Sequence, residues 1–357
     1  MKIFFKILIK TAKLFLIYSG ISFIIKIFNE FIYFKLYEKE LKSIILKNKP
    51  DIIYIHEFKA LLILRKIYKN NLLLFKDTKF IYDAHEIECF RNPPKNFFIR
   101  LIIEHIEIKF IKDTKSKIVS VSHGICNYYR NKFKNSKKVF LIKNLPSKIS
   151  FRNNLDDENY LRVSNIKKLF FNDIQKYDQA KLGIYVGNIT LNRGIEETIE
   201  LVNSYPNVYL AIIGNFSNKN FHNRITKLNY DKSRIKIFGE VHNELLVNFI
   251  KTADFAFVPT LPVTLSYYYS SPNKLHESKA ANLPIFAQNL PEHLIELKVN
   301  SSQPIGAVSD FFNHINLKND FEIFLNNLDK YKHNYKFEKN SYFNSPDQVE
   351  IYQKILE

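Results

Sequence analysis

Short apolar segments alternate with longer helical segments from Pro50 to Ala287, and this alternation limits the folds that the chain can adopt. The strand-like segments are 51–55, 79–82, 117–121, 139–142, 182–187, 208–214, 235–239, 255–259 and 284–287. Strands that alternate with helices at this spacing form parallel sheets with helices on both faces. Ligands of such sheets bind at the carboxyl ends of the strands. We therefore expect an α/β chain with its functional residues at those ends.

A polar tract separates this alternation into two halves. Residues 147–180 are rich in Asn, Asp, Lys and Ser and lack strong strands, so we expect a linker with a flanking helix there. The predicted domains are residues 1–165, which open with a helical segment at 1–48, and residues 166–340. A last helix within 341–357 could cross back to the first domain. A chain of 357 residues is long enough for two such domains, each with its own core.

The stretch Ser271–Pro284 has the pattern of a helix start that binds an anion. Ser271 is a good N-cap, and Pro272 suits the first helical position because it lacks an N–H group. The free N–H groups of residues 273–275 would then point out of the helix, at the positive end of its dipole. Glu277 lies one turn further along the same face, where its carboxylate could accept the hydroxyls of a ribose. A capped surface helix with a solvated Glu is the simpler alternative.

The segment from Gly187 to Gly194 predicts a strand–loop–helix turn whose backbone can approach a ligand closely. Arg193 lies at the start of that helix, where a cation is unfavourable against the helix dipole unless an anion compensates for it. A guanidinium there could pair with a diphosphate and stabilise the charge that develops as the diphosphate leaves. An ordinary surface Arg is the alternative, but the uncompensated charge favours an anion site.

Several short segments, in their order and spacing, resemble retaining GT-B glycosyltransferases of the family 4 type. These segments are PDIIYIH (50–56), YDAHE (82–86), VSHGI (121–125), NLP (144–146), VGNITLNRG (186–194), ADFA (253–256) and SPNKLHESKAANLP (271–284). The resemblance covers roughly residue 50 to the end of the chain. It implies a GT-B fold of two Rossmann-like domains with a cleft between them. It also implies transfer of a sugar from a nucleotide-diphosphate sugar.

The resemblance assigns roles to particular residues. His85, Arg193 and Lys274 would be catalytic: His85 would position the donor sugar, and the two cations would hold the diphosphate. The implied donor-binding residues are Gly187, Asn188, Gly194, Phe238, Gly239, Asn273, Leu275 and Glu277, with Glu277 on the ribose and Phe238–Gly239 beside the base. The candidates on the acceptor side, at the strand ends of the first domain, are His56, Ser122 and His123.

The implied mechanism is a front-face substitution in which the departing phosphate takes the proton of the acceptor. The protein would supply position and charge stabilisation rather than a nucleophile. The sequence has no Asp-x-Asp motif, so we expect no metal, and no cofactor besides the donor substrate. The His85–Glu86 pair does not indicate a metalloprotease, because no second His follows at helical spacing.

Four features depart from the family pattern. Tyr269 stands where the family has its first Glu, eight residues before Glu277. Asn282 replaces a Gly near the helix end, and Asn188 replaces a basic residue after the first Gly of the turn. Residues 1–48 offer only helix where the family opens with a strand and a glycine-rich loop. The first domain is therefore expected to lack its first strand.

The charge and the N-terminal segment bear on location. The formal net charge is +18, but abundant Lys, Asn, Ile and Phe with scarce Gly, Met and Trp suggest a biased coding composition that inflates Lys. Residues 1–34 are apolar and basic, and their longest uncharged run is too short to span a bilayer. They suit an anionic membrane surface, although buried helices flanking a sheet are an equal alternative. Only two cysteines are present, which favours a reducing compartment, so we expect a cytoplasmic protein at the inner face of the membrane.

Other functional classes remain to be weighed against a glycosyltransferase that acts on a cell-surface glycan or a lipid-linked acceptor. A catalytically inactive GT-B protein that serves as a membrane-associated binding partner is the main alternative, supported by the departures at Tyr269 and Asn188. A GT-B sugar-nucleotide epimerase would need catalytic carboxylates that the sequence does not place. A nucleic-acid binder would rest on charge alone, since no recognition motif accompanies it. We therefore expect no nucleic-acid partner.

Overall fold

The computed structural model describes residues 22–134, 136–146, 166–170, 180–239, 241, 243–337 and 345–357, with the side chains of the first helix described from Lys35 onward. The predictions made for residues 1–21 and for most of the linker lie outside these ranges. The chain forms two compact units, one of residues 1–83 and 104–117, the other of residues 84–103 and 118–357. The domain boundaries expected near residues 165 and 340 stay predictions.

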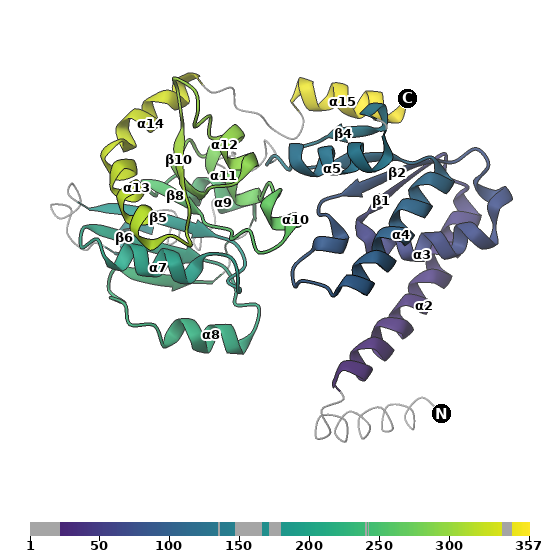
Figure 1. Cartoon of the computed structure of the whole chain (residues 1–357), viewed down its shortest axis with the longest axis horizontal. Helices are drawn as coiled ribbons and strands as arrows, with labels where there is room; N and C mark the ends of the chain where they lie inside the picture. Colours follow the sequence, from purple (N-terminus) through teal and green to yellow (C-terminus); the bar gives the residue numbers. More distant parts are fainter. Residues whose placement is uncertain are drawn as a thin grey trace. The chain divides into compact units, whose positions relative to one another are not determined.

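The first unit is built from two parallel strands and the helices that cover them (Figure 1). Its elements are α2 (Ser22–Asn48), β1 (Ile52–His56), α3 (Glu57–Asn70), η1 (Leu72–Phe75), β2 (Lys79–Ala84) and much of α4 (Phe97–Thr114). β1 pairs in parallel with β2, so that His56 lies opposite Asp83. Leu61 and Ile67 on one face of α3 are buried, as is Phe110 of α4. This spacing of apolar residues explains why these segments fold as amphipathic helices against the strands.

The second unit contains the remaining strands. In chain order they are β3 (Lys117–Ser120), β4 (Val139–Leu141), β5 (Lys181–Val186), β6 (Val208–Ile213), β7 (Ile235–Phe238), β8 (Phe255–Val258), β9 (Ile285–Gln288) and β10 (Gly306–Ser309). Strands β1 to β4 follow one another in a four-stranded sheet, and the other six form a sheet in the order β10-β9-β8-β5-β6-β7. The second sheet is parallel at every pair.

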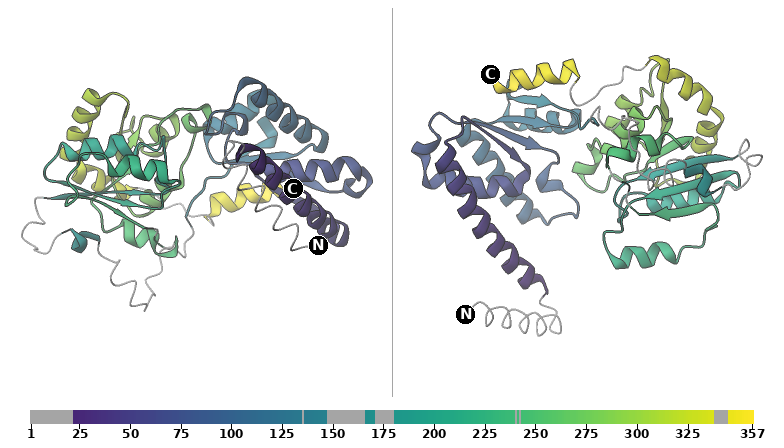
Figure 2. Two further views of the ribbon diagram at one scale, coloured as in Figure 1. Left: turned by 90° about the horizontal axis from the view of Figure 1, so that it is seen from below. Right: turned by 180° about the vertical axis from the view of Figure 1, so that it is seen from behind.

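The helices of the second unit connect these strands. They are α5 (His123–Phe133), α7 (Ile195–Asn203), α8 (Lys219–Thr226), α9 (Asn243–Ile250), α10 (Leu265–Tyr268), α11 (Asn273–Ala280), α12 (Pro291–Glu296), α13 (His314–Asn326), α14 (Leu328–Asn334) and α15 (Pro346–Leu356). The short 3₁₀ turns are η2 (Glu88–Phe90), η3 (Ser136–Lys138), η5 (Ile166–Leu169) and η7 (Tyr335–Phe337). The last helix, α15, lies beside β4 (Figure 2).

The six-stranded sheet is buried on both faces. Leu182 and Ile184 of β5 enter a core that α9 and α11 complete, whereas Tyr185 enters a second core with α7, α8, α13 and α14. The same alternation holds in β8, where Phe257 and Ala256 lie in different cores. Neighbouring strand residues point to opposite faces, so burial of both is the mark of a doubly wound sheet. The predicted α/β architecture is therefore confirmed.

Each of the nine predicted strands is present, with small shifts in its bounds. The tenth strand, β10, was not predicted, because its sequence, GAVS, has only two apolar residues and no strong apolar pattern. In the described part of the N-terminal segment, residues 22–48 form helix and no strand precedes β1, whereas the expectation for residues 1–21 lies outside the described residues. Among the helices described, none combines the length and the apolar character needed to cross a membrane.

Candidate functional site

The predicted anion-binding helix is present as α11, but its start differs from the prediction. Pro272, not Ser271, occupies the N-cap position, in an extended conformation (φ −72°, ψ 143°). The Ser271 hydroxyl forms a hydrogen bond of 2.8 Å with Nε2 of the buried His276 instead of capping the helix. The helix ends at Ala280, and Asn282, which replaces the Gly of the family pattern, adopts a left-handed conformation (φ +57°). Of the three N–H groups predicted to be free at this helix start, that of Leu275 instead donates to the Pro272 carbonyl oxygen (2.9 Å), so the prediction is wrong for that group.

The glycine turn lies beside this helix and depends on close backbone packing. Gly187 (φ +126°) follows β5, and Gly194 (φ +71°) stands at the N-cap of α7. A Cβ atom on Gly194 would lie 2.1 Å from the carbonyl oxygen of Pro259, and one on Gly214 would lie 2.1 Å from the carbonyl oxygen of Gly187. Glycine alone fits such positions without a backbone shift. Gly214 was not among the predicted residues, although its place at the end of β6 was a usable signal.

Arg193 and Lys274 bring two cations to this turn. Lys274 Nζ lies 3.8 Å from the centroid of the Tyr185 ring, and the guanidinium carbon of Arg193 lies 4.8 Å from that of Tyr267. Neither cation forms an ion pair with any residue that the structure describes, and the buried Nε of Arg193 has no hydrogen-bond acceptor there. A buried lysine and a half-buried arginine, neither of which forms an ion pair with a described carboxylate, favour an anionic ligand.

The electrostatics of these groups support the same interpretation. Burial lowers the pKa of Lys274 well below its ordinary value, and the charge of Arg193 lowers it further, whereas Glu277 opposes the shift. Burial raises the pKa of the Glu277 carboxyl, and Lys274 opposes that shift. A bound diphosphate would relieve the repulsion between the two cations and restore the charge of Lys274. The site is thus unfavourable when empty and favourable around an anion.

The other predicted donor residues are placed as follows. Asn188 and Asn273 have exposed side chains, whereas the Leu275 side chain is fully buried and its N–H group is bonded to Pro272, so that neither is available to a ligand. The Phe238 carbonyl accepts a hydrogen bond from Gly214 N (3.2 Å) at the end of β7. Gly239 is exposed, and a Cβ atom there would meet only open space. These residues lie at strand or helix ends, and their roles in donor binding stay predictions.

The polar candidates at the ends of the first sheet have partners of their own. His56 Nδ1 lies 2.9 Å from Asp83 Oδ2, with an exposed imidazole. His85 follows β2, and its Nδ1 lies 3.3 Å from Asn144 Nδ2. Ser122 is fully buried and accepts the N–H of Ile125, so it serves as the N-cap of α5. His56, Asp83 and His85 each offer an atom that could ligate a metal, within 4.8 Å of one another, so the expected absence of a metal stays a prediction.

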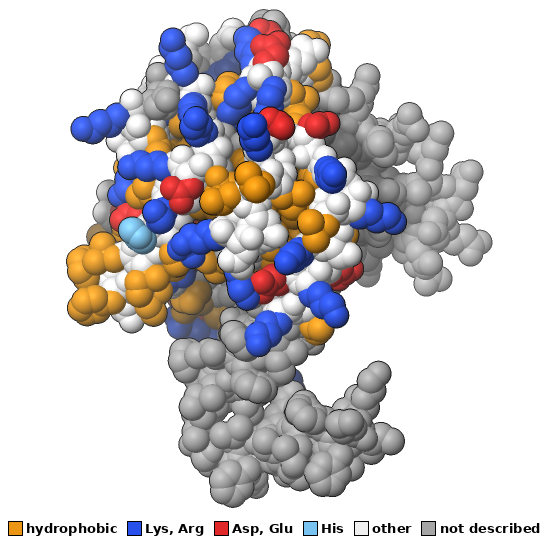
Figure 3. Space-filling view, turned by 90° about the vertical axis from the view of Figure 1, so that its right-hand side faces the viewer, with side chains coloured by type: hydrophobic (Ala, Val, Ile, Leu, Met, Phe, Trp, Pro, Cys, Tyr) orange, Lys and Arg blue, Asp and Glu red, His pale blue; other side chains and the backbone are white. Residues whose placement is uncertain are grey.

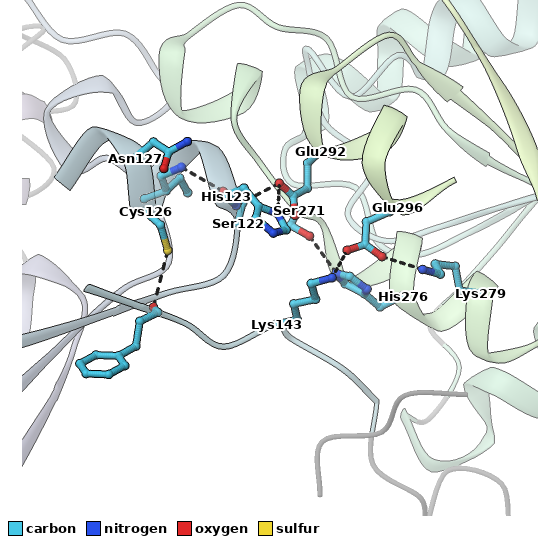
Figure 4. A network of polar contacts seen from close by, with 12 residues as sticks. Ser122, His123, Cys126, Asn127, Lys143, Ser271, His276, Lys279, Glu292 and Glu296 are labelled. Carbon is cyan, nitrogen blue, oxygen red and sulfur yellow. Dashed lines mark hydrogen bonds and ion pairs between the residues drawn. The ribbon is translucent and has the colours of Figure 1, made fainter. Parts of the chain in front are cut away.

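His123 belongs to a charged network that joins the start of α5 to α12 (Figure 4). Its Nδ1 lies 3.1 Å from Oε1 of the buried Glu292, and its backbone N–H donates to Oε2 of the same carboxylate (3.0 Å). Glu296, one turn along, accepts Lys143 Nζ at 2.5 Å and Lys279 Nζ at 2.6 Å. Burial would raise the pKa of Glu296, but the surrounding cations outweigh it and hold the pKa at about 2. No sequence motif predicted these pairings.

Comparison with known proteins identifies the fold. Sucrose-phosphate synthase from Thermosynechococcus elongatus superposes with a TM-score of 0.62 at 14% identity, over 90% of this chain and 77% of that one. The Anabaena HepE structure with UDP-glucose gives 0.62 at 12% identity, over 89% and 78%. A putative UDP-N-acetylglucosamine 2-epimerase from Listeria monocytogenes gives 0.55 at 10% identity, over 90% and 77%. No match was found among curated proteins.

These likenesses establish the GT-B fold, two Rossmann-like domains, which confirms the predicted fold class. Because an epimerase shares it, the fold alone does not decide the activity. Residues 166–342 match the family model described as "Glycosyl transferases group 1". The chain thus carries a group 1 glycosyltransferase domain that includes the glycine turn and α11, and it is a glycosyltransferase with the GT-B fold.

Proposed function

We propose that the chain transfers a sugar, with retention of configuration, from a nucleoside-diphosphate sugar to a cell-surface glycan or a lipid-linked acceptor, as family 4 enzymes do. The observation that carries this proposal is the pair of cations, Arg193 and Lys274, beside the glycine turn and without an anionic partner among the described residues. A solved structure that shares the fold holds UDP-glucose, which supports a nucleotide sugar as the donor class.

The chemistry requires position and charge rather than a protein nucleophile. The bond between the anomeric carbon and the leaving phosphate oxygen breaks while the acceptor oxygen bonds to that carbon on the same face. The departing phosphate oxygen takes the acceptor proton. Arg193 and Lys274 stabilise the negative charge that builds on the diphosphate, and the N–H groups at the start of α11 add the helix dipole. Glu277, one turn along α11, holds the ribose.

The direct test is turnover of donor by the full chain. Incubation with a panel of UDP-, GDP- and TDP-linked sugars should release a nucleoside diphosphate slowly in the absence of acceptor, and the liberated sugar should keep its anomeric configuration by NMR. Binding without any release would favour the inactive binding partner, to which Tyr269 and Asn188 point. Inversion at the anomeric carbon would refute the retaining mechanism while leaving the donor site intact.

His85 provides a second test of the proposed mechanism. We expect His85→Ala to reduce the rate of sugar release or transfer by about 100-fold, because misplacing the donor sugar costs rate, while affinity for the free nucleoside diphosphate changes less than twofold. Calorimetry and the turnover assay measure the two quantities. Asn144→Ala, which removes the side chain beside His85 Nδ1, should have a smaller effect in the same direction. Equal losses of binding and turnover would make His85 a structural residue.

We further propose that the protein works at the cytoplasmic face of a membrane, where a lipid-linked acceptor would be found. An apolar patch supports this: at the start of α4, Phe97, Phe98, Leu101 and Ile102 are exposed, Phe98 to 75%. Figure 3 shows one face on which exposed hydrophobic side chains lie among many Lys and Arg side chains. An exposed cluster of large apolar side chains marks an interaction surface, and a positive surface attracts anionic lipid.

Liposome sedimentation tests this placement. Binding to vesicles with anionic lipid should be strong and should weaken as salt rises, since the attraction is screened within a Debye length. Reversal of charge at Lys6, Lys10 and Lys13, which precede the described residues, should reduce binding, and Phe97→Ser with Phe98→Ser should reduce the salt-resistant part. Vesicle binding that is the same in both variants as in the wild type would refute the membrane placement.

A further inference from the structure

A cavity of about 390 Å³ lies between α5 and α10 of the second unit. It is lined by Gly124, Asn127, Tyr128, Asn131, Lys132, Leu265 and Tyr269. The five lining residues of α5 are spaced by three and four positions, so they form one face of that helix, and Leu265 and Tyr269 are likewise four apart. The cavity is therefore built by two facing helical surfaces, and its volume lies within the range of small-ligand sites, roughly 300–1,000 Å³.

The lining has a defined chemical character. Two half-buried tyrosine rings, Tyr128 and Tyr269, provide flat apolar surfaces, and the exposed amides of Asn127 and Asn131 lie at the rim. Arg130 donates to Asn127 Oδ1 at 3.0 Å, which leaves the amino group of Asn127 to donate to a ligand. The charged lining residue is Lys132, whose Nζ is 5.7 Å from the centroid of the Tyr128 ring. Rings that cover C–H faces and amides that bind hydroxyls suit a saccharide.

Tyr269 gives this cavity its shape. A Cβ atom on Gly124 would lie 2.2 Å from Cδ1 of the Tyr269 ring, so the ring packs directly on the glycine at the first turn of α5. A glutamate at position 269 could not supply that surface. Tyr269, which departs from the family pattern, thus packs against Gly124, and its aromatic ring lines the cavity where the family has a carboxylate.

The cavity and the donor cations lie on different sides of one short helix. The guanidinium of Arg193 lies over the ring of Tyr267 in α10. Leu265 and Tyr269, two positions before and after Tyr267, line the cavity. Residues two apart in a helix point in different directions. A saccharide in the cavity would therefore be a neighbour of the donor rather than the donor itself.

We infer that this cavity binds a saccharide unit of the acceptor, with a negatively charged substituent, phosphate or carboxylate, beside Lys132. The inference rests on the proposed function, because it names the second substrate of the same reaction. Tyr128 and Tyr269 hold the sugar ring, and Asn127 and Asn131 bind its hydroxyls. The single cation among the lining residues sets the preference for an anionic saccharide over a neutral one.

Saturation-transfer NMR on the full chain with UDP present tests this inference. The probes are N-acetylglucosamine 1-phosphate, glucuronic acid, methyl α-glucoside and inorganic phosphate. We expect transfer to the ring protons of at least one of the two anionic sugars, stronger than to the methyl glucoside, and at least a fivefold loss in Tyr128→Leu and in Tyr269→Leu. Inorganic phosphate should not displace a bound sugar at equal concentration. Lys132→Ala should remove the preference for the anionic sugar and keep the contact with the ring.

Tyr268→Leu is the matched control, because this exposed tyrosine neighbours Tyr269 but does not line the cavity. It should bind the sugars like the wild type. Absence of transfer to every sugar in the wild type, or signals that Tyr128→Leu and Tyr269→Leu leave unchanged, would overturn the inference. The affinity for UDP, measured on the same samples, distinguishes the proposed donor site from the proposed saccharide site. This affinity should stay within twofold of the wild-type value in all these variants. If the wild type did not bind UDP, the result would count against the donor site and not against the saccharide site.

Discussion

Replacing Arg193 with alanine should weaken the affinity of the protein for a nucleoside diphosphate by roughly 1.5–3 kcal/mol, because a charge-assisted contact with the diphosphate is lost. Lys274→Met should have an effect of similar size, since it removes the second cation and keeps a side chain that fills the same buried space. Isothermal titration calorimetry with UDP and GDP measures both. Arg224→Ala is the matched control, because this exposed arginine of α8 pairs with Glu196 and belongs neither to the glycine turn nor to α11.

The same titration has a predicted pH dependence. In the free protein the pKa of Lys274 is lowered, chiefly by burial, and a bound diphosphate should raise it again. At a pH between the pKa of Lys274 in the free protein and its pKa in the complex, binding requires uptake of a proton, so affinity should fall as pH rises. Calorimetry in buffers of different ionisation enthalpy should show this uptake. Lys274→Met should abolish the uptake. Wild-type affinity in both single variants, or release of protons by the wild type, would contradict the assignment.

Gly194→Ala should lower the free energy of unfolding by about 3 kcal/mol and should also impair nucleotide binding. A Cβ atom at this left-handed position (φ +71°) meets the Pro259 carbonyl oxygen at 2.1 Å. Strain at a left-handed residue and overpacking against backbone each cost roughly 1–3 kcal/mol. Urea unfolding followed by circular dichroism measures the loss. The expected result follows from the backbone alone, so it does not depend on the identity of the donor.

Gly239→Ala is the matched control for this substitution. Gly239, like Gly194, is a glycine at a predicted donor position, but a Cβ atom there meets nothing within 4 Å. Its stability should change by less than about 0.5 kcal/mol, as for most surface substitutions. If Gly194→Ala were as stable as Gly239→Ala, the packing of the turn against β8 would be wrong.

Much of the fold could be predicted because its signals are local. Apolar runs such as residues 208–213 and the bounding Gly and Pro residues mark buried parallel strands without reference to the rest of the chain. Segments with weaker patterns were missed: β10 (GAVS) has only two apolar residues, and α10 is a single turn capped by Thr264. Their positions follow from packing on the sheet, which single-sequence patterns do not carry.

The residues of the candidate site also fall into two groups, those that lie in a local sequence motif and those whose contacts are distant in sequence. Gly187, Gly194, Arg193 and Lys274 could be found because each lies in a contiguous motif at a strand or helix end. Tyr185 and Tyr267, whose rings contact Lys274 and Arg193, could not be assigned to the site from the sequence, since each is distant in sequence from the cation that it contacts.

The pairings in the network around α12 were out of reach for the same reason. His123 and its partner Glu292 are 169 residues apart. The N-cap of α11 was predicted one residue too early for a different reason. The Ser271 hydroxyl bonds to the buried His276 instead of to the helix backbone, and the preference of Ser for N-caps does not anticipate this contact.

A crystal structure of the full chain with a nucleoside diphosphate would locate the donor site. We expect diphosphate oxygens within hydrogen-bonding distance of the Arg193 guanidinium, of Lys274 Nζ and of N–H groups at the start of α11, with the ribose hydroxyls on the Glu277 carboxylate. A nucleotide bound elsewhere on the chain, with Arg193 and Lys274 still without an anion, would contradict this assignment.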